Sequence, residues 1–98
     1  MEHGSYKSFF EAAAIGDLEL VRGYVRTGVD VNFIHPEFQS TALVVSILGS
    51  HEDVALFLLE QGADSSQLSP LDELTPIEAA EKMELESVKT KLIDLTND

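Results

Sequence analysis

The chain has 98 residues, enough for one domain with a modest core, and its apolar fraction of 44% is that of a folded protein rather than a disordered one. It has no cysteine, which excludes disulfides and cysteine-based metal sites. A formal net charge of −12 argues against nucleic acids and anionic membrane surfaces as partners. Because no apolar run approaches the ~20 residues of a membrane helix and no signal sequence is recognised, we expect a soluble, cytoplasmic protein.

The negative charge is concentrated in the middle of the chain. Between Arg26 and Lys82 there is no Lys or Arg, whereas acidic residues recur throughout that interval. A basic partner would be attracted to such a region, most strongly at low salt. The alternative is that the charge only keeps a small protein in solution.

The first expected helix pair lies within residues 5–26. Either Ser5 or Ser8 is placed to cap a helix that ends at Gly16. Asp17 then caps a second helix, which carries apolar residues on one stripe. Such a stripe is typical of a helix that covers a core from one side.

The second expected pair, residues 41–61, is the most apolar part of the chain. Thr41 caps a short apolar helix, and a second helix runs from Glu52 to Gln61. Gly62 ends it, because glycine tolerates the positive φ of a helix end. This second helix is apolar without interruption over residues 54–59. It must therefore be covered on more than one side.

The third expected pair begins with strong helix-start chemistry. Thr75 is a capping residue, Pro76 suits the first helical position, and Glu78 completes a capping box. The last helix, expected over residues 84–95, has one apolar stripe and is polar elsewhere. That pattern is typical of a terminal unit that closes a stack.

The three pairs are related by a spacing of 34 residues. A fixed period of this length indicates a repeat array, in which each unit covers its neighbour. Two connectors of matching length, the first finger (residues 30–40) and the second finger (residues 64–74), are expected to project as hairpin-like loops. The pairs that show the spacing are Gly28 and Gly62, Pro36 and Pro70, and Thr41 and Thr75.

The motifs of these units are specific. The central unit opens with Thr41-Ala42-Leu43, continues through His51 and ends with Gly62-Ala63-Asp64, and the next opens with Thr75-Pro76-Ile77. In this the chain resembles the ankyrin repeat family over roughly residues 8 to 95. The resemblance implies an all-α solenoid, a single domain over residues 1–98 made of helix-turn-helix units with hairpin-like loops. Its repeats would span about residues 5–40, 41–74 and 75–96.

Two departures from the family pattern bear on the fingers and the helix starts. The histidine that follows the Thr-Pro-Leu motif is Val44 in one unit and Glu78 in another. The glycine expected two residues before the threonine is Gln39 or Glu73. The finger tips are therefore expected to differ in shape from the family norm.

The resemblance further implies a concave face, built from the fingers and the inner helices, that binds another protein. Three large apolar residues in one connector need a cover, either a partner or the core of the chain itself. They are Phe33, Ile34 and Phe38. The full set of candidate partner-binding residues is Phe33, Ile34, His35, Glu37, Phe38, Gln39, Val45, Leu48, Leu68, Leu71, Asp72, Glu73 and Lys82.

Catalytic constellations are absent from the sequence. It has no glycine-rich phosphate loop and no Gly-x-Ser-x-Gly elbow. His35 is expected to be solvated or to touch a partner, and His51 to be a helix-entry residue; neither has a neighbour at metal-ligand spacing. We therefore expect no enzyme, no cofactor and no metal.

The leading hypothesis is a monomeric interaction module that blocks or scaffolds one basic protein partner. The chain also looks similar in build to short bacterial ankyrin proteins that act as immunity partners, so a toxin such as a nuclease is a candidate partner. The alternative is a structural or self-association module that acts through its terminal repeats. The aromatic cluster of Tyr6, Phe9 and Phe10 motivates that alternative.

Overall fold

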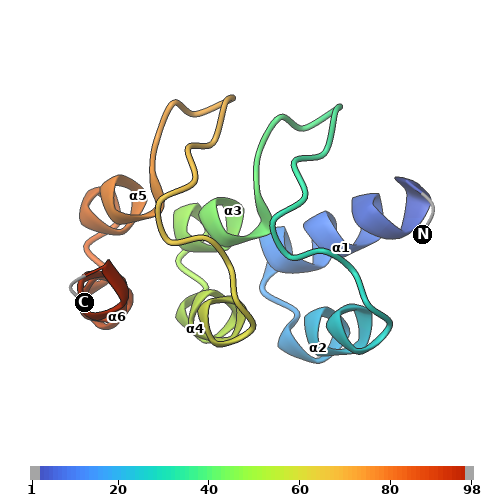
Figure 1. Ribbon diagram of the computed structural model, residues 1–98, viewed down its shortest axis with the longest axis horizontal. Coiled ribbons are helices and arrows are strands. Elements are labelled where there is room, and N and C mark those ends of the chain that lie inside the picture. Colours follow the sequence, from blue (N-terminus) through green and yellow to red (C-terminus); the bar gives the residue numbers. More distant parts are fainter. Residues whose placement is uncertain (1–2, 97–98) are drawn as a thin grey trace.

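The computed structural model describes residues 3–96, which form six helices and, within that range, no strand. The inner helices α1, α3 and α5 pack side by side in one row, and α2, α4 and α6 form a second, outer row (Figure 1). The two fingers rise together from the stack, on the side away from the outer helices. In chain order the elements are α1 (His3–Ile15), α2 (Leu18–Arg26), α3 (Ala42–Leu48), α4 (Glu52–Glu60), α5 (Pro76–Lys82) and α6 (Glu86–Thr96).

The core runs along the stack between the two rows. The central helix α4 contacts α2, α3 and α6, so it is covered on several sides, as its continuous apolar run predicts. Val54 and Leu58 of α4 are completely buried, as are Val44 and Ile47 of α3. On the outer surface the guanidinium of Arg22 lies 4.9 Å from the centre of the Phe57 ring and links α2 to α4.

The caps expected from the sequence are present. Asp17 Oδ1 accepts a hydrogen bond from Leu20 N at 3.1 Å, and Thr41 Oγ1 accepts one from Val44 N at 3.1 Å. Thr75 and Glu78 form the expected capping box at the start of α5. Local chemistry therefore fixes where three of the helices begin.

Two helix starts differ from expectation. α1 begins at His3, so Ser5 and Ser8 lie inside the helix and do not cap it. Tyr6, near the start of this helix, accepts a hydrogen bond from Asp30 N at 3.0 Å and so links α1 to the first finger. α6 begins at Glu86 instead of residue 84, because Glu84 takes a left-handed turn conformation with a φ of 57°.

Residues with positive φ recur at the spacing of 34 residues, more regularly than the glycines do. Gln39 and Glu73 adopt the left-handed conformation at the finger tips, so the turn that favours glycine is kept without glycine. Each such residue costs about 1 kcal/mol in backbone strain. The recurring sets are Gly16 (80°), Ser50 (61°) and Glu84 (57°); Gly28 (96°) and Gly62 (94°); and Gln39 (54°) and Glu73 (55°).

His51 is the residue before α4, as expected, and it also joins two helix pairs. Its Nε2 lies 2.9 Å from the carbonyl oxygen of Ala14, at the end of α1. A Cβ atom at Gly16 would collide with the imidazole, and one at Gly49 would lie 2.7 Å from its Cδ2. The ring therefore occupies the space that these two glycines leave open.

Candidate protein-binding groove

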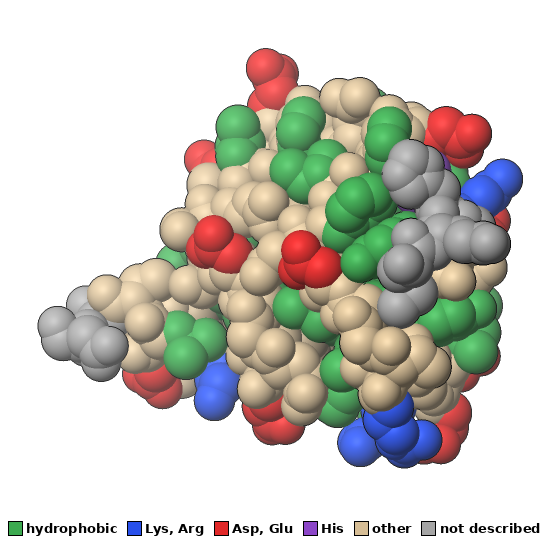
Figure 2. All heavy atoms as spheres, turned by 45° about the vertical axis from the view of Figure 1, so that its right-hand side comes forward, with side chains coloured by type: hydrophobic (Ala, Val, Ile, Leu, Met, Phe, Trp, Pro, Cys, Tyr) green, Lys and Arg blue, Asp and Glu red, His purple; other side chains and the backbone are tan. Residues whose placement is uncertain are grey.

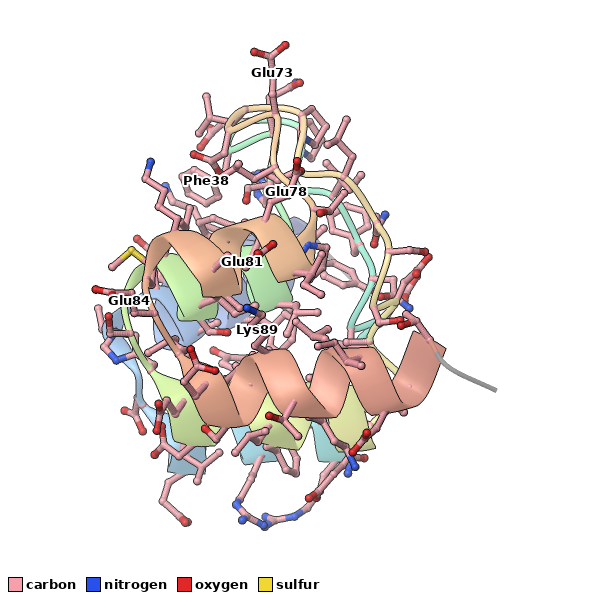
Figure 3. The ribbon with its side chains drawn as sticks, turned by 90° about the vertical axis from the view of Figure 1, so that its left-hand side faces the viewer. Phe38, Glu73, Glu78, Glu81, Glu84 and Lys89 are labelled. Carbon is pink, nitrogen blue, oxygen red and sulfur yellow. The ribbon has the colours of Figure 1, made fainter. Side chains whose placement is uncertain are left out.

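A groove of about 340 Å³ lies between the fingers and the inner helices. Its walls are mostly apolar, with two carboxylates and one hydroxyl among the lining side chains. Figure 3 shows Phe38 in the angle between the first finger and the inner helices. The lining residues are Phe10 from α1, Glu37, Phe38 and Ser40 from the first finger, Val45 and Leu48 from α3, and Leu71 and Asp72 from the second finger.

Aromatic rings hold the first finger against α1. The ring of Phe38 stacks on Phe10, with centroids 4.5 Å apart, and the ring of Phe33 lies 4.0 Å from that of Tyr6. Figure 2, which brings the first helix pair forward, shows hydrophobic side chains gathered over the upper part of the molecule, where the fingers lie. Because the rings on both sides of the contact are large and stiff, they fix the position of this finger.

His35 is buried, so the prediction that it is solvated is wrong. Only 7% of its surface is exposed, and its Nδ1 accepts a hydrogen bond from Glu37 N at 3.0 Å. Its ring lies 4.6 Å from that of Phe38, and its carbonyl oxygen accepts a hydrogen bond from Gln39 N at 2.7 Å. The tight turn of the finger tip folds the imidazole inward, where it supports Phe38.

Hydrogen bonds hold the second finger. The hydroxyl of Ser69, which is completely buried, bonds to the Ser40 hydroxyl at 2.9 Å and to the Asp72 carboxylate at 3.0 Å. Leu71 N donates to the carbonyl oxygen of Gln39 at 2.8 Å and thus joins the two finger tips. A single antiparallel bridge pairs Ser69 with Leu74, which gives this finger its hairpin form. Leu71 itself stays 67% exposed at the mouth of the groove.

The roots of the fingers are joined by Asn32. Its side-chain amide donates to the carbonyl oxygen of Gly62 at 3.2 Å and accepts from Asp64 N at 2.7 Å. The Asp64 carboxylate in turn accepts from the backbone N–H and the hydroxyl of Ser66, and these two bonds hold the pKa of Asp64 below its ordinary value. The two fingers are therefore coupled at their bases as well as at their tips.

The structure brings together part of the candidate set. The candidates that line the groove are Glu37, Phe38, Val45, Leu48, Leu71 and Asp72. Those that do not line it are Phe33 and Ile34, which are half-buried, the buried His35, the finger-tip residues Gln39 and Glu73, and the exposed Leu68 and Lys82. Glu73 points away from the stack at the top of the second finger (Figure 3). Sequence reasoning missed two lining residues, Phe10 and Ser40, because both reach the groove through contacts between distant parts of the chain.

The carboxylates of the groove have no basic partner among residues 5–96, whose side chains the structure describes. The ion pair found in that range joins Lys89 Nζ to Glu81 Oε2 at 3.8 Å, between α5 and α6 (Figure 3). Glu37 is exposed and Asp72 is half-buried, so both are accessible to a ligand. The groove thus combines an apolar floor with two carboxylates that no described basic side chain neutralises.

Two further kinds of feature were sought in the described part of the chain. No three His, Asp or Glu side chains there are grouped closely enough to hold a metal ion. None of the helices formed by residues 3–96 has the length and the apolar character needed to cross a membrane.

Comparison with known proteins agrees with the fold. The chain is 33% identical over 78 residues, 80% of its length, to ankyrin repeat domain-containing protein 40 of mouse (Mus musculus) and of human (Homo sapiens). It spans about a fifth (21%) of the length of these relatives. No protein-family model matches the chain. The similarity supports an ankyrin-repeat family, and with it a general role in protein–protein interaction; the fold is an all-α, ankyrin-like stack.

Proposed function

We propose that this chain is a protein interaction module whose groove binds one basic protein and thereby blocks or scaffolds it. The observation that carries the proposal is the groove itself, in which apolar side chains from two fingers and two inner helices lie beside unpaired carboxylates. Apolar anchors that are ringed by polar groups are where protein interfaces concentrate their binding energy.

Electrostatics favours a basic partner. The chain carries 18 acidic residues against six Lys and Arg, and both carboxylates of the groove come from the acidic interval between Arg26 and Lys82. Opposite charge on a partner would accelerate association, and the rate would fall as salt screens the attraction. In the absence of a partner the chain is proposed to be monomeric.

The test pairs two substitutions of the same kind at different places. Leu48→Glu puts a charge on the apolar floor of the groove, whereas Ile15→Glu puts one at the end of α1, where Ile15 is 70% exposed and outside the groove. A partner is first identified by cross-linking and pull-down from the native host, and its affinity is then measured by calorimetry with purified proteins. We expect Leu48→Glu to weaken binding by about tenfold or more and Ile15→Glu to leave it nearly unchanged.

Two results would contradict the proposal. One is a partner whose affinity is lowered equally by Leu48→Glu and Ile15→Glu, while circular dichroism shows that both variants are folded. The other is an affinity that does not change between low and high salt, which would remove the electrostatic part of the argument.

A narrower form of the proposal makes the partner a toxic basic protein, such as a nuclease, which the chain holds inactive as an immunity protein. The net charge of −12 and the unpaired carboxylates of the groove support this form. The relatives give no support for a toxin as the partner, since their names mention only ankyrin repeats. Co-expression of the chain with a toxic product of a neighbouring gene tests this form. We expect the chain to rescue growth and the Leu48→Glu variant to fail to do so.

The aromatic residues that suggested self-association through the first repeat pack within the chain. Phe9 is only 3% exposed, Tyr6 packs on Phe33, and Phe10 packs on Phe38. The aromatic cluster at the N-terminal end is thus used within the chain. A sedimentation experiment over a range of concentrations tests the proposed monomer directly.

A further inference from the structure

We propose that the groove recognises a short, extended segment in which a large apolar side chain stands next to Lys or Arg. The apolar side chain would enter between the rings of Phe10 and Phe38 and the side chain of Leu48, while the cation would pair with Glu37 and Asp72. This inference rests on the proposed function and specifies the chemistry of the partner at that one site.

The size and lining of the groove favour a side chain as its occupant. Its volume of about 340 Å³ is at the lower end of the range of ligand pockets, which suits one or two side chains better than a packed helix. Val45 and Leu48 of α3 and the ring of Phe38 supply the apolar contact. The hydroxyl of Ser40 is already bonded to Ser69, so an apolar occupant leaves it with a hydrogen-bond partner.

The carboxylate of Asp72 is oriented by a hydrogen bond before any cation binds. Its Oδ2 is bonded to the Ser69 hydroxyl at 3.0 Å, which restricts the rotation of the side chain. No ion pair to Asp72 occurs among the described side chains of residues 5–96, and its other oxygen makes no hydrogen bond to them. A carboxylate that is already oriented loses little side-chain freedom when it binds an ammonium or guanidinium group.

The two carboxylates come from different fingers, which places negative charge on two sides of one apolar site. Glu37 lies beside Phe38 in the first finger, and Asp72 lies beside Leu71 in the second. Leu71 is 67% exposed and would cover an apolar side chain that had entered the groove. An occupant with a cation on either flank of its apolar residue therefore matches the lining.

The experiment uses synthetic nonapeptides of matched length and the full chain. The central residue is Leu, Phe or Ser, the flanking residues are Lys, Gln or Glu, and affinity is measured by fluorescence anisotropy at low and high salt. We expect the Leu- and Phe-centred peptides with Lys flanks to bind tightest. Replacing Lys by Gln should weaken binding about three- to fivefold, as for exposed ion pairs.

Variants locate the binding within the groove. Glu37→Gln with Asp72→Asn should abolish the advantage of Lys over Gln flanks, while Asn at position 72 keeps an acceptor for Ser69. Glu86→Gln on α6 removes an exposed charge that is not part of the groove, and it should change nothing. Leu48→Glu should abolish binding of every peptide.

The outcomes separate this inference from the proposed function. If Lys- and Gln-flanked peptides bind equally, or if no nonapeptide binds, the inference is wrong. In those cases the proposed function still stands if Leu48→Glu abolishes the binding of a whole protein partner. If peptides and partner alike bind Leu48→Glu as well as the unmodified chain, both fail.

Discussion

The two fingers have almost the same backbone but are held in place by different chemistry. Both tips turn through a left-handed residue, Gln39 at 54° and Glu73 at 55°. At equivalent positions, however, the first finger carries rings and the second carries polar groups. The equivalent pairs, at a spacing of 34 residues, are Phe33 and Gln67, His35 and Ser69, and Phe38 and Asp72.

The difference follows from what each finger packs against. α1 is 13 residues long and provides Tyr6 and Phe10 as a platform for rings. α3 is 7 residues long and begins only after Ser40, the equivalent of Tyr6, and the equivalent of Phe10 is the aliphatic Val44, so α3 has no rings to offer. The second finger is instead bonded to the first through Ser69, Ser40 and Gln39. The first finger is therefore held by ring contacts with α1 and the second by hydrogen bonds to the first, and both fingers line the groove above the inner helices.

The largest loss of stability is expected when the ring contact between the first finger and α1 is removed. Phe38→Ala removes a half-buried ring that stacks on Phe10 and should lower the free energy of unfolding by about 2 kcal/mol. Leu71→Ala in the second finger removes a side chain that is 67% exposed and should cost less than about 0.5 kcal/mol. Urea denaturation followed by far-UV circular dichroism measures both. Equal losses for the two variants would mean that the fingers are held alike.

A smaller loss of stability is expected when the hydroxyl network of the second finger is removed. Ser69→Ala leaves the Ser40 hydroxyl, 2% exposed, without its partner and releases Asp72, so we expect a loss of about 1–2 kcal/mol. The double variant Ser40→Ala with Ser69→Ala removes both hydroxyls and should cost less than the sum of the single variants. Strict additivity in the same denaturation assay would show that the bond between the fingers contributes nothing.

A third prediction concerns the feature that the fingers share. Glu73→Gly relieves left-handed strain at its tip and should raise the free energy of unfolding by about 0.5–1 kcal/mol. Gln39→Gly relieves the same strain but loses the bond from Gln39 Nε2 to Pro36 O at 3.0 Å, so its gain should be smaller. Gln61→Gly is the matched control, since Gln61 has a φ of −89° and gains no relief. Thermal unfolding of the three variants measures the effect. No gain in Glu73→Gly, relative to Gln61→Gly, would show that the left-handed residue at the tip costs no strain.

Much of the fold could be predicted from the sequence because its signals are local. Asp17, Thr41 and Thr75 cap their helices through bonds three residues away, and such spacings are visible in a sequence. The start of α1 could not be predicted in this way, because the two serines that resemble caps, Ser5 and Ser8, lie inside the helix.

The same distinction separates the residues of the groove. Positions in the fingers and on α3 could be placed from the repeat pattern, since each unit repeats its geometry. Phe10 and the burial of His35 depend on ring contacts with Phe38, which join segments that are distant in the sequence or fold back through a tight turn. No periodicity encodes such contacts.

The smallest expected effect lies at the root of the second finger, where Asp64 has a lowered pKa because Ser66 donates two hydrogen bonds to its carboxylate. A carboxyl whose pKa is lower in the folded state stabilises the fold above its unfolded pKa, and it loses this contribution as the pH falls through the folded pKa. The window therefore lies below the ordinary value of 3.8. Since Asp64 is exposed, solvent screening keeps the contribution below about 0.5 kcal/mol.

Ser66→Ala removes the hydroxyl and leaves the backbone bond, so the pKa of Asp64 should move part of the way back toward its ordinary value. A carboxyl carbon titration by NMR measures the shift directly, and Thr27→Ala, which removes a hydroxyl bonded to a carbonyl oxygen at the end of α2, is the control. An unchanged pKa in Ser66→Ala would assign the effect to the backbone N–H alone. In that case the root of this finger, unlike its tip, would not depend on a serine hydroxyl.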